Sequence, residues 1–365
     1  MTRTHLKIFD REPRVLAKAF LFWALTISLT PTGFAAEFAN IEYLCCDWGP
    51  AMKLPSKVGE KAQFDDGQEE VYFLKQVGRF TRGALGNQGQ GVSVYLCKMK
   101  PDGSDKVQIK ELWRDPSCAI DTQAQTTWMD VNAKTKKLVL SIVIGGDEIR
   151  GLWTMNLDGS ELKRIQTPGM EAGGRTSFGH PSWTPDGKWI VFGKGVRGPQ
   201  GLTGGLAKCD AQGSNTVYLT TSIDDTMPRV SPDGKEIAYI HHVGYASRLY
   251  LMNIDGTNQH PLPNPDDKRW GTHGGTYPAW SPDGKQIHGI GMGTIDAVTG
   301  RTLLDITPTV QGRPGTCGWA HWGRRGFVGF TVGGVLVTDD ELREARWIGS
   351  SKLVECSRKA DSCRW

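Results

Sequence analysis

A four-residue segment, Pro-Asp-Gly-Lys, occurs three times at nearly constant spacing and constrains the fold more than any other feature. Each copy follows a hydroxyl residue and precedes a short apolar run, and the aspartates lie 47 and 50 residues apart. The copies, each with its hydroxyl residue, are Thr184–Lys188, Ser231–Lys235 and Ser281–Lys285. Proline presets one turn angle and glycine supplies the positive one, so each copy predicts a hairpin turn. A hairpin that returns at this interval is typical of a repeat architecture with one small antiparallel sheet per period.

A second recurring segment lies downstream of these turns. Leu152–Ser160 parallels Leu249–Thr257, and both carry a Met-Asn pair before an Asp-Gly turn. Weaker copies are Tyr95–Ser104 and Leu206–Ser214. Each period therefore holds two hairpins, and four short strands repeated about an axis make a propeller. The sequence predicts an all-β fold, a single β-propeller of four-stranded antiparallel blades.

The number of blades follows from weaker copies of the first turn. Degraded copies begin at Phe64, where Asp65–Gly67 is the expected turn, at Trp128 and at Trp322. With the three clear copies they predict six blades over residues 62–352. A seventh blade remains an alternative if the flanking segments contribute strands.

One column of the repeat predicts packing between the sheets. Met99, Met155, Cys209 and Met252 each stand three residues before the first central residue of a turn. Methionine is a soft apolar side chain and a free cysteine behaves as a small hydrophobe. We therefore expect Cys209 to be a buried thiol rather than a ligand.

The repeat resembles that of the TolB-like propellers, which are extracytoplasmic relatives of the WD-repeat proteins. The resemblance is carried by Trp280–Lys285 with the apolar strand that follows, and by Leu249–Thr257. It covers three blades well and the other three loosely. It implies the fold but not an activity, because such blades occur in periplasmic binding proteins, peptidase accessory domains and polysaccharide lyases.

The N-terminal segment, residues 1–36, is typical of a secretory signal peptide. Basic residues precede an apolar stretch, Ala19–Leu29, that is too short to span a bilayer, and small residues follow it. An uncleaved membrane anchor is the alternative. We expect a periplasmic or secreted protein without a membrane span after cleavage. Residues 37–61 would then pack on or close the ring, and 353–365 would form a cysteine-containing tail.

Charge and cysteine content bear on the partners and the compartment. The formal net charge is +4, and five basic and two acidic residues in 1–36 account for +3 of it. The remaining charge near +1 gives no support for a nucleic-acid partner. All eight cysteines lie outside the signal, an even number that an exported protein can pair. A bridge between the Cys45–Cys46 pair and Cys356 or Cys363 would lock the two ends together.

Five of the seven histidines outside the signal map to one end of the predicted strands, opposite the Pro-Asp-Gly-Lys turns. They are His180, His241, His242, His273 and His321. The same loops carry Arg175, Arg197, Tyr245 and Tyr277. Any one histidine is explained by capping a strand end, whereas the cluster predicts a binding face. The acidic pair Asp224–Asp225 is interpreted as solvated surface in a loop between blades.

Two functions fit this face. The first is a module that binds a protein or an anionic glycan through Arg175, Arg197, His241, His242 and Tyr245, with no cofactor. The second is a polysaccharide lyase acting by β-elimination on uronate-containing glycans, as the resemblance to propeller lyases implies. Arginine would clamp the carboxylate, and His180, His273, His321 or Tyr277 would carry the proton.

Other functions lack their motifs. A divalent metal is expected only with the lyase function, and we expect a monomer in either case. A serine hydrolase elbow, a phosphate loop and a dinucleotide fingerprint are all absent from the sequence.

Overall fold

The computed structural model describes most of the chain between residues 37 and 349. The backbone is described for 37–39, 45–53, 63–83, 86–115, 127–142, 151–166, 175–198, 201–244, 246–265, 277–289 and 293–304, and for short strands up to 349. Side chains are described for 70–75, 93–114, 128–142, 151–166, 179–195, 203–244, 246–265, 277–289 and 294–303. All elements in these ranges are strands, so the described residues offer no long apolar helix that would cross a membrane.

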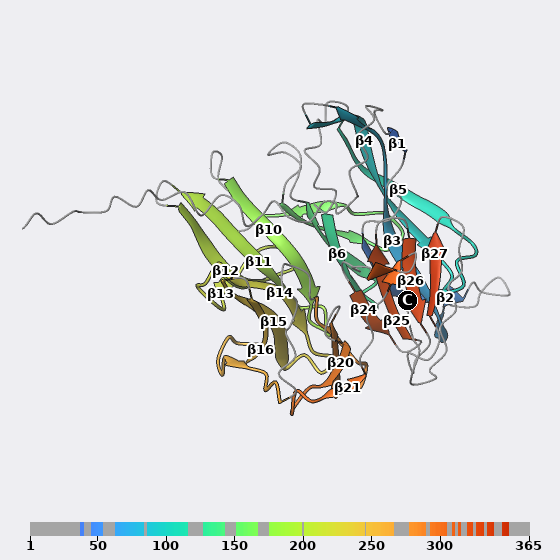
Figure 1. The fold of residues 1–365 in the computed structure, drawn as a ribbon. Coiled ribbons are helices and arrows are strands. Elements are labelled where there is room, and N and C mark those ends of the chain that lie inside the picture. The colour runs from blue at the N-terminus through green and yellow to red at the C-terminus, as the bar shows by residue number, and fades with distance from the viewer. Residues whose placement is uncertain are drawn as a thin grey trace, which may run out of the picture. The chain divides into compact units, whose positions relative to one another are not determined.

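Within the described residues, the strands form six blades, each an antiparallel meander (Figure 1). Blade 1 contains β2 (Cys45–Lys53), β3 (Gln63–Gly83), β4 (Gly86–Met99) and β5 (Val107–Asp115), with β1 (Glu37–Ala39) added to β3. Blade 2 contains β6 (Thr127–Asn132), β7 (Lys137–Ile142), β8 (Gly151–Asn156) and β9 (Lys163–Ile165). Blade 3 contains β10 (Arg175–Trp183), β11 (Trp189–Gly198), β12 (Gly201–Asp210) and β13 (Val217–Tyr218).

The C-terminal half repeats this pattern. Blade 4 contains β14 (Asp225–Val230), β15 (Glu236–Val243), β16 (Ala246–Asn253) and β17 (His260–Pro261). Blade 5 contains β18 (Ala279–Trp280), β19 (Gln286–Gly289), β20 (Gly293–Asp296) and β21 (Thr302–Leu304). A small hairpin of β22 (Thr309–Val310) and β23 (Arg313–Pro314) precedes blade 6, which contains β24 (Ala320–Gly323), β25 (Gly326–Thr331), β26 (Gly334–Thr338) and β27 (Ala345–Gly349).

The first strands of the blades pack against one another in chain order. β2 contacts β6, β6 contacts β10, and the series continues through β14 and β18 to β24. β24 in turn contacts β2 of blade 1. Four-stranded sheets whose first strands meet in this cyclic order are blades of a propeller, so the predicted fold is confirmed.

The predicted turns owe their shape to a repeated hydrogen-bond pattern. In the third copy the Ser281 hydroxyl donates to Asp283 Oδ1 at 2.6 Å and accepts the Gln286 N–H at 2.9 Å. Gly284 adopts the positive φ of 71° that the turn requires. The other two copies repeat these bonds, and in blade 2 the Asn132 side chain replaces the hydroxyl by accepting the Thr135 N–H.

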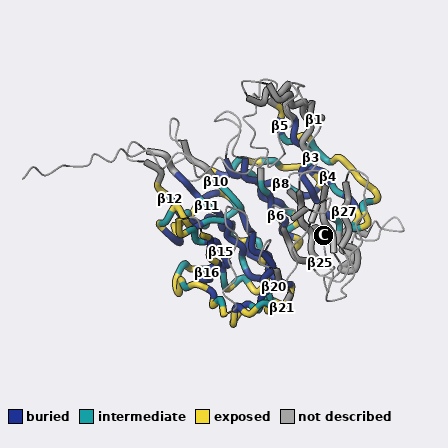
Figure 2. Tube along the Cα trace, viewed as in Figure 1, coloured by how far each residue is buried: buried dark blue, intermediate teal, exposed yellow. Residues whose placement is uncertain are grey.

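The predicted methionine column is buried between the sheets. Met99, Met155 and Met252 are each 1% exposed, and the free thiol of Cys209 is fully buried. Burial raises the pKa of Cys209 to about 12, so this side chain is an unreactive packing residue. Figure 2 shows buried residues along the first and second strands of blades 3 and 4, with exposed residues at the outer turns.

The first blade differs from its prediction. Asp65–Gly67 lies within the long strand β3 rather than in a turn, because β2 supplies the first strand of the blade and pairs with β3. The register shifts between Pro50 and Ala51, where proline offers no N–H to the ladder. Residues 1–36 and 353–365, and the side chains of the cysteines predicted to join the ends, lie outside the described residues.

Candidate functional site

The first strands of blades 3 and 4 are each interrupted by a β-bulge at the same place. The register shifts between Gly179 and Ser182 in β10, and between Thr226 and Arg229 in β14. Inside the bulges, His180 has a φ of 52° and Met227 a φ of 56°. Each precedes a proline, which has no N–H for the ladder, so the extra residue falls where pairing is already lost. A bulge re-aims the side chain that it carries.

The first strands of blades 2 to 5 can be aligned by counting back from the first residue of the turn that follows each strand. These turn residues are Asn132, Thr184, Ser231 and Ser281. Four residues before the first turn residue stand, in order, Trp128, His180, Met227 and Tyr277. Two residues before it stand Asp130, Ser182, Arg229 and Ala279. The first set is called the aromatic row here, although it includes Met227, and the second set the polar row, although it includes Ala279. Each set occupies equivalent positions on neighbouring first strands. Their members differ chemically, so the repeat is uniform in its turns and individual in its first strands.

The aromatic row brings together two of the predicted catalytic residues. The His180 ring lies 4.3 Å from the Trp128 ring and 5.1 Å from the Tyr277 ring, measured between centroids. Tyr277 is 7% exposed, and the Nε2 atom of His180 is buried. Burial, together with the nearby charges of Arg229 and His242, lowers the pKa of His180 to about 3. The imidazole is therefore neutral at physiological pH and packs between two aromatic rings.

The polar row contains a buried ion pair that joins blades 2 and 4. Arg229 donates to Asp130 Oδ1 at 2.5 Å, and both side chains are less than one tenth exposed. The other carboxylate oxygen of Asp130 accepts the backbone N–H of Trp183, in blade 3, at 2.6 Å. Trp280, in blade 5, donates its indole N–H to the Arg229 carbonyl at 3.0 Å. The Asp130 carboxylate and the Arg229 guanidinium thus link blades 2, 3 and 4, and the Arg229 backbone carbonyl adds the contact to blade 5.

Blade 4 places a partly exposed histidine beside a buried carboxylate. The Nδ1 atom of His241 lies 2.6 Å from Asp225 Oδ1, and the His241 ring lies 5.0 Å from the Tyr250 ring. Asp225 is 6% exposed, whereas the His241 side chain is 27% exposed. The interpretation of Asp225 as solvated surface is therefore wrong: this residue begins β14 and pairs with His241. The carboxylate fixes the orientation of the imidazole.

The neighbouring histidine points to the other face of the same sheet, since adjacent strand residues alternate. His242 Nδ1 lies 3.0 Å from the Ser247 hydroxyl, and its Nε2 lies 3.0 Å from the Thr226 hydroxyl. Both ring nitrogens are thus engaged. Burial lowers the pKa of His242, so this residue stabilises its own blade as a neutral ring.

The remaining predicted residues are placed by backbone alone or not at all. Arg175 and Arg197 lie directly opposite each other in the β10–β11 ladder, and His321 lies in β24 opposite Val328. His273 and Tyr245 lie outside the described residues. Among the side chains that are described, no three His, Cys, Asp or Glu residues are arranged to hold a metal ion.

The sequence interpretation missed Asp225, Asp130 and Arg229. The useful signal was their distance from the turns. Asp130 and Arg229 stand two residues before equivalent turn positions, and Asp225 lies six residues before Ser231. The first strands of neighbouring blades pack against one another. A charged residue two positions before a turn therefore indicates a buried contact between blades, as it does for Asp130 and Arg229.

Comparisons with known proteins give the following similarities. A curated, uncharacterised protein of Agrobacterium fabrum is 27% identical over 151 residues, which are 39% of this chain and 47% of that protein. The chain thus spans about half the length of the curated relative that it matches. No protein family profile matches the chain.

Similar solved structures are propellers of low sequence identity. TolB from Acinetobacter baumannii has a TM-score of 0.42 at 14% identity, covering 77% of this chain and 70% of TolB. A nidogen/laminin complex chain has a TM-score of 0.47 at 10% identity, covering 72% of this chain and 90% of that one. The oligogalacturonate lyase of Vibrio parahaemolyticus has a TM-score of 0.37 at 13% identity, covering 65% and 67%.

Proposed function

We propose that this protein is a binding propeller that holds an anionic ligand at the histidine end of its blades. The histidine end is the end of the β10–β11 and β14–β15 ladders that carries Arg175, Arg197, Asp225 and His241. The observation that carries the proposal is the Asp225–His241 pair. Its imidazole is oriented by a buried carboxylate and remains partly open to solvent.

The chemistry of this end suits a carboxylate-bearing ligand. Because Nδ1 of His241 faces Asp225, Nε2 is the atom available to a ligand, and it donates a hydrogen bond when the ring is protonated. The same end of the neighbouring blade carries Arg175 and Arg197 at paired positions. Guanidinium groups bind carboxylates through two parallel hydrogen bonds. Uronate-containing glycans and acidic protein segments both present such carboxylates.

Binding is favoured over lyase chemistry by the state of the predicted proton carriers. Of His180, His273, His321 and Tyr277, the described side chains are His180 and Tyr277. Both lie in the aromatic row, where Tyr277 is buried and His180 has a pKa near 3. A general base works best with a pKa near the operating pH, and it must reach the proton that it abstracts. These two residues are suited to packing.

The test is a calorimetric titration of the secreted form with a galacturonate oligosaccharide. We expect His241→Ala to weaken binding about tenfold, the factor expected for one charge-assisted hydrogen bond. His260→Ala is the control, because His260 lies on the outer strand β17 of the same blade and bonds the Asn258 carbonyl. Equal affinity in the two variants would contradict the proposal. Growth of ultraviolet absorbance from an unsaturated uronate would establish the lyase instead.

Export to the periplasm or the medium is part of the same proposal. It rests on the signal-like pattern of residues 1–36 and on the resemblance of the repeat to extracytoplasmic propellers. Sequencing the N-terminus of the protein recovered from a periplasmic extract tests it, and an intact N-terminus would contradict cleavage.

A further inference from the structure

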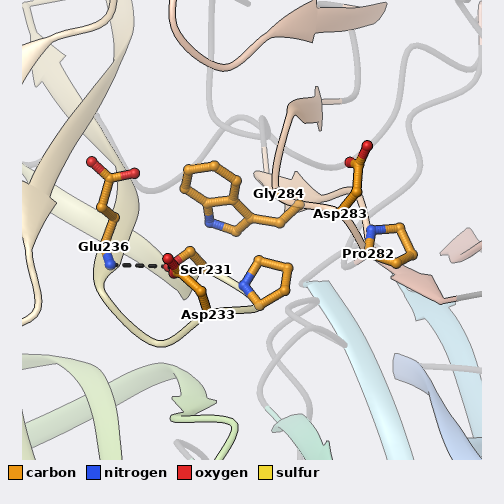
Figure 3. Close-up of a pocket in the computed structure, with 8 residues that line it drawn as sticks. Ser231, Asp233, Glu236, Pro282, Asp283 and Gly284 are labelled. Atoms are coloured by element: carbon orange, nitrogen blue, oxygen red, sulfur yellow. Dashed lines mark hydrogen bonds between the residues drawn. The ribbon is translucent and has the colours of Figure 1, made fainter.

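A pocket of about 260 Å³ lies between the first turns of blades 4 and 5. Its walls come from the turn of blade 4, the first residue of β15 and the turn of blade 5. Its lining residues are Ser231, Pro232, Asp233, Glu236, Trp280, Pro282, Asp283 and Gly284. Figure 3 shows Glu236 and Asp283 on opposite sides of this pocket. Glu236 begins β15 and His241 lies near its end, so the pocket is separate from the histidine end.

The three carboxylates of the pocket differ in how they are satisfied. The Ser231 hydroxyl donates to Asp233, and the Ser281 hydroxyl donates to Asp283; these bonds lower the pKa of each aspartate. The ammonium groups of Lys235 and Lys285 lie 3.5 and 3.9 Å from the same aspartates. Among the described residues, the Glu236 carboxylate has neither an ion-pair nor a hydrogen-bond partner. Glu236 therefore carries the uncompensated negative charge of the pocket.

An indole ring is held in place beside this charge. Trp280 lines the pocket, is 6% exposed and donates its indole N–H to the Arg229 carbonyl at 3.0 Å. That hydrogen bond fixes the ring to the polar row of blade 4. Aromatic faces attract cations, and indole does so most strongly.

The first turns of neighbouring blades leave similar gaps, and of the gaps between blades 2 and 3, 3 and 4, and 4 and 5, the last combines a carboxylate with an indole. The position of Glu236 corresponds to Lys137 in blade 2 and Trp189 in blade 3, five residues after the first turn residue. The position of Trp280 corresponds to Trp183 in blade 3 and Val230 in blade 4. The gap between blades 2 and 3 therefore pairs Lys137 with Trp183. The gap between blades 3 and 4 pairs Trp189 with Val230. Neither of these two gaps has a carboxylate at the position of Glu236.

We propose that this pocket binds an arginine side chain of a partner polypeptide. Its volume is below the roughly 300–1,000 Å³ of sites for drug-sized ligands, so it suits one side chain rather than an extended ligand. A guanidinium bonds a carboxylate through its planar fork and stacks on an aromatic face, whereas an ammonium does neither as well. Glu236 supplies the carboxylate and Trp280 the ring.

The test uses the tripeptide acetyl-Gly-Arg-Gly-amide as the probe, with nitrogen-15 spectra of the full protein. We expect the Trp280 indole and Gly284 amide signals to shift. We expect the lysine analogue to bind more weakly and the neutral citrulline analogue to produce no shift. Glu236→Gln should weaken arginine binding about tenfold. Glu161→Gln is the matched control, since Glu161 is an exposed carboxylate in blade 2, and it should leave the affinity unchanged.

Three results would overturn the proposal. The first is equal binding of the arginine and citrulline peptides, because the guanidinium charge would then be irrelevant. The second is unchanged affinity in Glu236→Gln. The third is a shift of the same signals with protein concentration in the absence of peptide, which would assign the pocket to contact between copies of this chain. Weakened binding at the histidine end alone would leave this proposal intact, since the two sites lie at opposite ends of β15.

Discussion

Removing the charge of Asp130 should destabilise the fold more than any surface substitution. Asp130→Asn keeps an oxygen for the Trp183 N–H but leaves Arg229 buried without its counter-charge. Breaking one partner of a buried ion pair costs about 3–5 kcal/mol of the free energy of unfolding. For the roughly 330 residues that follow the proposed signal, the unfolding entropy is about 0.7 kcal/mol per kelvin, so the melting temperature should fall by about 4–7 °C.

The assay is differential scanning calorimetry of the variant beside two controls. Glu161→Gln removes one partner of an exposed pair with Lys163 and should change stability by less than about 1 kcal/mol. The double variant Asp130→Asn, Arg229→Met removes both charges and should regain most of the loss, because no uncompensated guanidinium remains. A shift below 1 °C in Asp130→Asn, or a double variant as unstable as the single one, would refute the reasoning.

Three further outcomes are expected. Folding lowers the pKa of His180 from 6.5 to about 3, so acid favours the unfolded state, which binds the proton more tightly. As the pH falls below 6.5, the free energy of unfolding should decrease about 1.4 kcal/mol per pH unit more steeply in the wild-type protein than in His180→Asn. Parallel slopes in urea titrations from pH 7 to 4 would contradict this. Gly213→Ala should cost more stability than Gly244→Ala: both have positive φ, but a Cβ at Gly213 would lie 2.2 Å from a backbone oxygen, whereas Gly244 has open space. Thermal melts of the two variants test the difference. The Cys209 thiol should resist alkylation until the protein unfolds, as peptide mapping with and without urea would show.

The fold was predictable because its turns are local chemistry. A serine or threonine, a proline, an aspartate and a glycine form the turn from their own hydrogen bonds and backbone angles, wherever the segment lies. The methionine column followed from the same alignment, because residues at one distance from a turn share one face of the sheet. Blade 1 was not predicted correctly because the sequence between β2 and β3 carries no copy of the Pro-Asp-Gly-Lys segment.

The candidate site was less predictable because it depends on register. The ladder next to the turn pairs Arg229 with Ala238, and the same register would set Asp225 opposite His242. The bulge shifts the pairing by one residue, so Asp225 meets His241 instead. A shift of one residue exchanges the two faces of a strand. The sequence signal for this shift is the proline after Met227, which identifies a lost ladder bond but not the size of the shift.

The unequal polar row also bears on how the chain selects one arrangement of near-identical units. During assembly, a blade that slipped by one repeat would find a turn and an apolar strand almost the same as its own. It would also set Ala279 in the place of Arg229, and the Asp130 carboxylate would then be enclosed without a cation. A penalty of that kind discriminates against misordered rings and against exchange of units between copies of the chain. The uniform turns build the scaffold, and one buried ion pair, which only the correct order of blades satisfies, selects that order.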